Sequence, residues 1–320
     1  MKLGVFTVCL HHMPFAEAAK YLHSQGVQCV EIGAGGYPGD THLKTAEFLA
    51  NTSYRDQWKD ILKQNQLTVS AVSCHGNPVH PNAGIADKFH KDFQQAVLAA
   101  ELLGVDTVIG FSGVPAGAKG DTTPNWPTVS WPGEYGEALK YQWEILVPYW
   151  EKMAKFCADH GVTKIALEMH GGFSVYNPAT LLRLREAVGD AIGANFDPSH
   201  LIWQGMDPVA CIRALEGAIH HFHAKDTKIN KRNADVNGLL DLRHYSDEIN
   251  RSWIFRTVGY GQSAETWKEM FSALRLCGYD GAISIEHEDS LMSPREGLEK
   301  AISFLKDTMM FEDKGAVTWA

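Results

Sequence analysis

Short apolar runs alternate along the chain with longer segments of helical periodicity. The helical segment after the first run ends at Gly26, and a long helix predicted over about 86–103 ends at Gly104, so both glycines have the position of a C-terminal cap. Strands that alternate with helical crossovers are typical of a parallel sheet. The predicted strands are KLGVFTV (2–8), VQCVEIG (27–33), LTVSAVSCH (67–75), VDTVIGF (105–111), TKIALEM (163–169), AIGANFD (191–197), IHHFHA (219–224) and GAISIEH (281–287).

Eight β/α units in a chain of 320 residues predict an α/β fold, a single (β/α)8 TIM-barrel domain over residues 1–320. No GxGxxG turn follows the first strand, so a dinucleotide-binding fold is not indicated. Two connections are unusually long. We expect 112–140, rich in Gly, Pro and Trp, to be a lid-like insert, and 227–262 to be a long loop after the seventh strand. The next helix is predicted to begin beyond Tyr141 and to reach Gly161.

Composition limits the functional classes. The formal charge of −9 argues against a nucleic-acid or anionic-membrane surface, because both need a basic field. The six cysteines show no CxxC spacing and indicate neither a disulfide framework nor a zinc ribbon. The chain opens directly as a strand and contains no apolar run of transmembrane length. We therefore expect a soluble cytoplasmic protein that acts on a small molecule.

Acidic or imidazole side chains stand at the ends of the last four predicted strands. They are Glu168, Asp197, His223 and Glu286. The carboxyl ends of barrel strands meet at one mouth, so these groups are expected to converge. Three carboxylates and one imidazole need a divalent cation to offset their repulsion, and their atoms suit a hard or borderline ion. The pattern predicts a metal enzyme.

Each of these residues also has a structural interpretation. Glu168 can be a solvated strand end, and Asp197, in FDPSH, can cap the following helix. His223 can be a hydrogen-bonded core histidine, and Glu286 lies in a segment that is acidic throughout. The equivalent positions on four consecutive strands favour the metal interpretation of the whole set.

Histidines at other strand ends are candidates for the chemistry. His170 lies two residues after Glu168 and therefore points into the same mouth. Its reference pKa, about 6.5, suits proton transfer at neutral pH, although steadying Glu168 or the substrate is an equally good role. His75 ends the third strand and is a candidate substrate contact.

The long connections add weaker candidates. Trp126, with Trp131 and Trp143, offers a stacking surface for a sugar or an aglycone, or simply packs a lid. Arg256 can hold a substrate oxygen or form an ion pair. The VGYG turn at 258–261 can present N–H groups to an anion, but two glycines are a thin signal, and we expect a substrate without phosphate.

The segments ALEMH, NFDPSH, HFHAKD and SIEHED resemble the metal-site segments of the sugar phosphate isomerase/epimerase family. These xylose-isomerase-like TIM barrels are related to endonuclease IV, ketose 3-epimerases and C-glycoside deglycosidase catalytic subunits, and the resemblance covers nearly the whole chain. It implies that Glu168, Asp197, His223 and Glu286 bind Mn²⁺, or else Mg²⁺, Co²⁺ or Zn²⁺. It also implies that His200 contacts a substrate oxygen and that Lys225 is the basic residue after the seventh-strand histidine.

The resemblance to endonuclease IV does not extend to its three-zinc cluster. The fourth strand ends in IGFSG without a histidine, and no Asp-x-His pair follows His223. A single metal ion is therefore expected, and cleavage of DNA is not.

The resemblance and the residues together predict a metal-dependent isomerase or epimerase of a sugar, keto-sugar or cyclitol. Its shared step is proton abstraction next to a metal-bound carbonyl, with Glu168, Glu286 or His170 as the base. The alternative is a lyase that cleaves 3-oxo-glycosides by β-elimination, as the deglycosidase subunits do with a small β-rich partner. A third class is a carbohydrate-binding barrel without catalysis. A homo-oligomer fits either enzyme.

Overall fold

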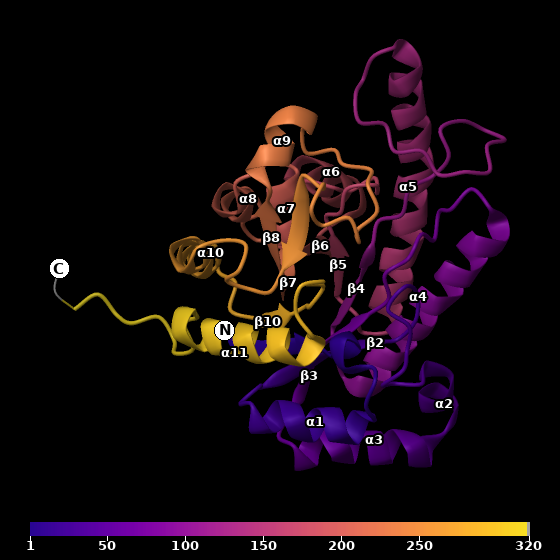
Figure 1. Ribbon diagram of the computed structural model, residues 1–320. Coiled ribbons are helices and arrows are strands. Elements are labelled where there is room, and N and C mark those ends of the chain that lie inside the picture. Colours follow the sequence, from indigo (N-terminus) through magenta and orange to yellow (C-terminus); the bar gives the residue numbers. More distant parts are fainter. Residues whose placement is uncertain (319–320) are drawn as a thin grey trace.

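Eight parallel strands close into a barrel in the computed structural model, which describes residues 1–318 (Figure 1). The strand order around this barrel is β1-β10-β7-β6-β5-β4-β3-β2. The first and last strands close it, with Lys2 paired to Ala282 and Val5 to Ile285. The barrel strands are β1 (Lys2–Phe6), β2 (Cys29–Gly33), β3 (Thr68–Ser73), β4 (Thr107–Phe111), β5 (Lys164–Glu168), β6 (Ile192–Phe196), β7 (Ile219–Ala224) and β10 (Ala282–Ile285).

Helices surround the barrel, as the alternating pattern predicts (Figure 1). Gly104 caps α4 with a φ of 70°, and Gly26 follows α1 with a φ of 73°, so both glycines have the left-handed backbone expected of them. Within residues 1–318, no helix is both long and apolar enough to cross a membrane. The helices are α1 (Phe15–Ser24), α2 (Thr45–Ala50), α3 (Thr52–Gln64), α4 (Ala83–Leu103), α5 (Gly133–Asp159), α6 (Pro178–Val188), α7 (Pro198–Trp203), α8 (Pro208–Ala214), α9 (Lys231–Asn237), α10 (Ala264–Leu276) and α11 (Pro294–Thr308).

The predicted start of one helix is wrong by eight residues or more. Helix α5 begins at Gly133 and not beyond Tyr141, so the last residues of the segment 112–140 are helical. Pro132 at the N-cap and Glu134 in the first turn are start signals that the surrounding Gly and Pro residues obscured. Helix α5 therefore rises well above the barrel strands (Figure 1).

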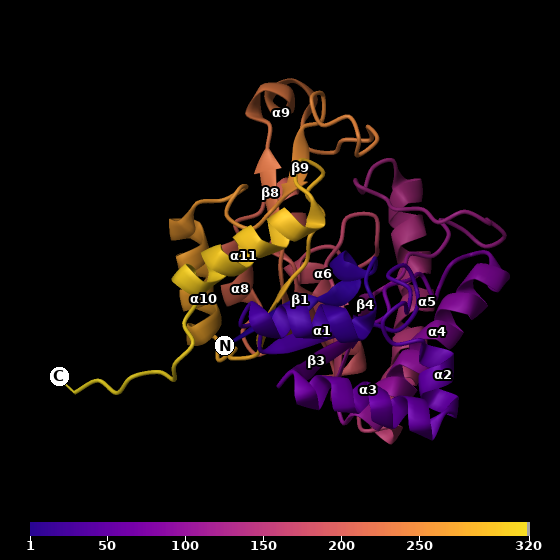
Figure 2. The same ribbon diagram turned by 60° about the horizontal axis from the view of Figure 1, so that its bottom comes forward.

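The segment 227–262 contains regular structure. Strands β8 (Asp226–Ile229) and β9 (Trp253–Arg256) form an antiparallel pair, with α9 between them. Together they project from one end of the barrel (Figure 2). Two rings of this pair, Trp253 and Phe255, pack with Trp203 of α7 in a small buried cluster. This contact holds the segment 226–256, which we call the β8–β9 excursion, next to the ends of the barrel strands.

Candidate active site

The structure brings the four predicted metal ligands together at the ends of β5, β6, β7 and β10. One ligand atom from each of Glu168, Asp197, His223 and Glu286 lies within 4.8 Å of all the others. Nδ1 of His223 is 3.2 Å from Oε2 of Glu168 and 3.0 Å from Oε2 of Glu286. The Glu286 side chain is 13% exposed, and the other three are at most 3% exposed. The cluster is thus a buried meeting point of three acids and one imidazole.

Asp197 and His223 each combine the two interpretations that the sequence left open. Oδ1 of Asp197 accepts a 2.8 Å hydrogen bond from the Ser199 N–H and so caps α7, whereas Oδ2 faces the cluster. Nε2 of His223 bonds the carboxylate of Glu31 at 2.9 Å, whereas Nδ1 faces the cluster. Each side chain therefore has one anchored atom and one atom directed at the centre.

Three buried atoms at this centre have no hydrogen-bond partner within residues 1–318. They are Oδ2 of Asp197, Nδ1 of His223 and Oε2 of Glu286. These atoms are held by ion pairs alone, between Lys225 and the two carboxylates and between His223 and Glu286. A divalent cation coordinated by these atoms and by Glu168 would satisfy all of them, and oxygen and imidazole ligands suit Mn²⁺, Mg²⁺, Co²⁺ or Zn²⁺. The residues present therefore fit such an ion.

The charges of the cluster lead to the same conclusion. Burial and the neighbouring carboxylates of Glu168 and Glu286 together raise the pKa of Asp197 to about 7, against the attraction of Lys225. Nζ of Lys225 is 3.1 Å from Asp197 and 2.9 Å from Glu286. Burial alone would raise the pKa of Glu286, but Lys225 and His223 hold it well below its ordinary value. The three carboxylates repel one another, and a divalent cation would offset this repulsion.

A cavity of about 290 Å³ opens above the cluster. Its lining combines polar and charged side chains with aromatic rings, which suits a small polar ligand with apolar ring faces. It is lined by Phe6, Val8, Tyr37, Pro38, His75, Phe111, Glu168, His170, His200, Lys225, Glu286 and Glu288.

Three imidazoles of the predicted site face this cavity. Nε2 of His75 and Nε2 of His200 each lie 3.1 Å from an oxygen of Glu168. The ring of His170 lies 4.0 Å from that of His200, between centroids, and its Nδ1 meets the Gly171 carbonyl oxygen at 2.5 Å. Burial lowers the pKa of His170 below its ordinary value, so this ring is neutral at pH 7.

Two predicted substrate contacts do not line the cavity. Nε of Arg256 lies 3.1 Å from Oδ2 of Asp289, so Arg256 forms the ion pair that was its alternative role. Trp126 packs against the aromatic cluster of Trp203, Trp253 and Phe255, with its ring edge against Tyr176. Both predictions depended on where a long connection places its side chains, and here these side chains contact other parts of the protein.

The backbone N–H groups of the VGYG turn bind a carboxylate of the protein itself. The N–H groups of Gly259, Gly261 and Gln262 donate to the carboxylate of Asp226 at 2.9, 3.1 and 3.0 Å. Nε1 of Trp267 donates to the same carboxylate at 3.2 Å. The N–H donors of this turn are therefore already used within the protein.

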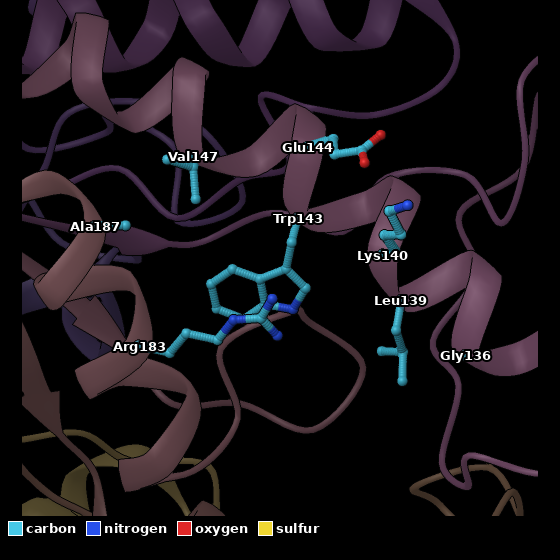
Figure 3. Close-up of a pocket in the computed structure, with 8 residues that line it drawn as sticks. All are labelled: Gly136, Leu139, Lys140, Trp143, Glu144, Val147, Arg183 and Ala187. Atoms are coloured by element: carbon cyan, nitrogen blue, oxygen red, sulfur yellow. The ribbon is translucent and has the colours of Figure 1, made fainter.

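A larger groove of about 530 Å³ lies on the outside of the barrel, between α5 and α6. Figure 3 shows the guanidinium of Arg183 stacked on the ring of Trp143, at 3.8 Å from its centroid. None of the residues that line this groove is a histidine or a residue of the acidic cluster. The chemistry therefore belongs to the barrel mouth and not to this surface.

Sequence reasoning missed a polar layer beneath the cluster. Asn195, His221 and Ser284 are fully or almost fully buried, and each lies two residues before a predicted ligand. Because side chains two apart on a strand share a side, that spacing is the signal that could have found them. Glu288, which follows Glu286 by two residues, lines the cavity and lies 3.1 Å from Nζ of Lys225. For Glu31 on β2, the only signal in the sequence was its position as the single acidic residue of an apolar run.

The chain is similar to known proteins over most of its length. The chain is 42% identical to the uncharacterized protein YfiH of Bacillus subtilis (strain 168) over 313 residues, which cover 97% of this chain and 99% of that protein. It is 24% identical to the inosose dehydratase of Mesomycoplasma hyopneumoniae (strain J) over 295 residues, 91% of this chain and 88% of that one.

The fold is shared with solved structures of low sequence identity. The IOLI protein, described with a binding zinc atom, matches with a TM-score of 0.66 and 19% identity, over 96% of each chain. Epimerases and a probable dehydratase are among the other structural neighbours. The family model described as "Xylose isomerase-like TIM barrel" matches residues 19–308. The chain therefore belongs to the xylose isomerase-like TIM barrel family.

Proposed function

We propose that the protein is a divalent-metal-dependent isomerase or epimerase of a sugar, keto-sugar or cyclitol. The observation that carries the proposal is the group of four ligand atoms within 4.8 Å, two of whose residues, Glu168 and Glu286, line a cavity together with the neutral imidazole of His170. A divalent ion bound there acts as a Lewis acid that makes the C–H next to a carbonyl more acidic. The zinc atom of the IOLI structure supports a metal at this mouth.

His170 is the best-suited base. Its Nδ1 must donate to the Gly171 carbonyl, since a carbonyl oxygen only accepts, so the neutral ring keeps a lone pair on Nε2. The carboxylate of Glu168, in contrast, accepts from His75, His200 and Asn195. Burial alone would raise the pKa of Glu168, but the nearby imidazoles of His200, His223 and His75 hold it well below its ordinary value, which makes it a weak base.

Lys225 and His200 are placed to hold the substrate oxygens. Nζ of Lys225 lies 3.2 Å from Nε2 of His200, and both side chains line the cavity. Attraction to Asp197, Glu286 and Glu288 overcomes burial and keeps the pKa of Lys225 well above its ordinary value. The ammonium therefore remains charged and stabilises negative charge that develops on a substrate oxygen.

Elimination is the second candidate, and the relationship to inosose dehydratases favours it. It begins with the same proton removal at the carbon next to the carbonyl, and the leaving group then departs from the next carbon. Loss of water from a keto-cyclitol and cleavage of a 3-oxo-glycoside are both reactions of this kind. The cationic Lys225 at the cavity wall would assist departure of a hydroxide or an alkoxide.

Solvent exchange tests the proposal. Purified protein with Mn²⁺ is incubated in D₂O with keto-sugars, inososes and 3-oxo-glucosides, and NMR follows the C–H next to the carbonyl. Deuterium that enters recovered substrate or its isomer supports isomerisation or epimerisation, whereas an unsaturated ketone or a released aglycone supports elimination. Absence of exchange with every compound, from protein whose bound Mn²⁺ has been measured, would contradict the proposed function.

A further inference from the structure

A second group of metal-ligating side chains lies directly below the first. Glu31 of β2 and the two histidines His221 and His223 of β7 have ligand atoms within 4.8 Å of one another. All three are at most 2% exposed. Two imidazoles and a carboxylate are also the ligands of many zinc sites. The group is therefore either a second cation site or a set of hydrogen-bonded partners.

The hydrogen bonds of Glu31 decide against a second cation. Nε2 of His223 lies 3.0 and 2.9 Å from its two oxygens. The hydroxyl of Ser73 on β3 donates to Oε1, and that of Ser284 on β10 donates to Oε2 at 2.7 Å. Both oxygens of Glu31 are thus hydrogen-bonded. The two serines lie on β3, which neighbours β2, and on β10, which neighbours β1.

His221 is also fully engaged. Its Nδ1 meets Oδ1 of Asn195 at 3.0 Å, and its Nε2 meets the hydroxyl of Ser70 at 3.2 Å. Asn195 in turn donates from Nδ2 to Glu168 at 2.9 Å. No nitrogen of His221 is left to bind an ion. The lower group is a hydrogen-bonded layer that contacts two members of the upper one.

From this geometry we infer that Glu31 is a positioning residue that fixes the tautomer and the orientation of the His223 ring toward a bound cation. An ionised carboxylate only accepts, so Nε2 of His223 carries the proton that it donates to Glu31, and Nδ1 is the nitrogen left to bind a cation beside Glu168 and Glu286. The ring of Phe6 stacks on His223 at 5.8 Å between centroids and limits rotation of its plane. The inference rests on the proposed function, because it assigns Glu31 a role in metal affinity.

Metal titration of Glu31→Gln tests the inference. Isothermal titration calorimetry gives the Kd of Mn²⁺ for the wild type and the variant, and the visible spectrum of the Co²⁺-loaded proteins reports the ligand geometry. We expect the variant to bind Mn²⁺ about 10–100-fold more weakly, the range for loss of a partner of a metal-ligating histidine, and to show a shifted Co²⁺ spectrum. Glu31→Asp keeps the charge but withdraws the carboxylate by one methylene, and is expected to weaken binding too.

The control is Ile109→Val, which removes one methylene from a buried cluster of the barrel interior that has no hydrogen bond to the site. Its Kd for Mn²⁺ is expected to equal that of the wild type. Thermal unfolding of the metal-free proteins identifies variants that fail to fold. A folded Glu31 variant with wild-type Kd and Co²⁺ spectrum overturns the inference alone, whereas a wild type that binds no divalent ion overturns the proposed function with it.

Discussion

The two carboxylate oxygens of Asp197 have different roles, one in stabilising the fold and one in the proposed metal site. Its Oδ1 caps α7 through the Ser199 N–H, and its Oδ2 faces the cluster without a hydrogen bond, 3.1 Å from Nζ of Lys225. An asparagine can keep the cap, since its carbonyl oxygen also accepts, but it presents an NH₂ group or a neutral oxygen to the cation. The two functions can therefore be lost independently.

We expect Asp197→Asn to fold with nearly the stability of the metal-free wild type and to lose more than about 100-fold in Mn²⁺ affinity, which exceeds the effect of changing a partner of a ligand. Asp197→Ala removes the cap as well and should lower the free energy of unfolding by a further ~1 kcal/mol. Calorimetric titration and urea denaturation of both variants check this. Equal Mn²⁺ affinity in Asp197→Asn and the wild type would contradict the assignment.

His170 is the residue on which the chemical step depends. We expect His170→Gln to slow solvent exchange at the substrate carbon by about 10²–10⁴-fold, the usual contribution of a general base, with an unchanged Mn²⁺ content. The exchange rate is measured by NMR at saturating substrate. His23→Gln is the control, because His23 is exposed on α1, away from the mouth. Exchange at the wild-type rate in His170→Gln would exclude His170 as the base.

The positions of the site residues were predictable where a strand end sets them. Glu168, Asp197, His223 and Glu286 follow apolar runs, so the barrel geometry alone brings them together. The alternation of side chains along a strand extends the same logic to His170. Contacts such as that of Arg256 with Asp289 were beyond reach, because they join two loops whose relative position depends on the whole fold.

At the scale of elements, the β8–β9 excursion is fastened to the barrel by buried carboxylates. Asp226 at the start of β8 accepts from the turn at 259–262, and Asp289 accepts from Arg256 and from the Thr257 N–H at 2.8 Å. Both contacts lie between the excursion and the segments that follow β9 and β10. They fix the excursion relative to the strand ends that form the site.

The turn at 259–262 requires glycine. A Cβ on Gly261 would collide with Oδ1 of Asp226 and with the Thr227 carbonyl oxygen. We expect Gly261→Ala to lower the free energy of unfolding by about 1–3 kcal/mol, as overpacking does, measured by urea denaturation. Gly136→Ala is the matched control: nothing lies within 4 Å of its Cβ position on α5, so alanine should be neutral or stabilising. An unchanged free energy of unfolding in Gly261→Ala would show that the turn can shift to accommodate the methyl group.

The contribution of Asp289 to stability should depend on pH. Burial alone would raise its pKa, but the N–H groups of Thr257 and Leu291 and the guanidinium of Arg256 hold it below the ordinary 3.8. A folded-state pKa below the unfolded one means that stability is fully present above about pH 4 and is lost as pH falls through the folded-state value.

We therefore expect Asp289→Asn to lower the free energy of unfolding by about 1.5–3 kcal/mol at pH 7, since it weakens hydrogen bonds to a charged group. The difference from the wild type should shrink as pH falls below 4. Urea denaturation at pH 7, 5, 4 and 3 measures it. A difference that stays constant over this range would mean that the charge of Asp289 contributes nothing.

Element types were easier to predict than element boundaries. Most of the strands were identifiable because they are short, largely buried and rich in apolar residues, as in β6, where Ile192–Phe196 are all buried. The start of α5 was missed because WPGEYG has the composition of a loop, and a Pro at a helix entrance reads the same way until the following turns are known to be helical. The β8–β9 pair was missed inside a segment interpreted as a loop.

For the whole molecule, the metal and the fold are expected to be thermodynamically linked. The four ligands come from β5, β6, β7 and β10, so a bound ion joins strands that are far apart in sequence. An unfolded chain cannot present them together, and binding therefore stabilises only the folded state.

We expect Mn²⁺ at 100 times its Kd to stabilise the protein by about 2.7 kcal/mol, and EDTA to reverse this. Thermal unfolding with increasing Mn²⁺ should show a Tm that rises with concentration. Asp197→Asn, scanned in parallel, should show little change at the same concentrations. A Tm of the wild type that is unaffected by Mn²⁺, Co²⁺, Zn²⁺ and Mg²⁺ would contradict a metal site at the barrel mouth.

Asp226 has a consequence for which compounds the barrel accepts. TIM barrels often bind phosphoryl groups with the loops after their seventh and eighth strands and with the N-terminus of a nearby helix. Here the equivalent ring of amides, just ahead of α10, already encloses a carboxylate that belongs to the protein. The carboxylate of Asp226 would block a phosphoryl group from these amides and would repel its negative charge. We therefore expect uncharged polyols to bind more tightly than their phosphate esters.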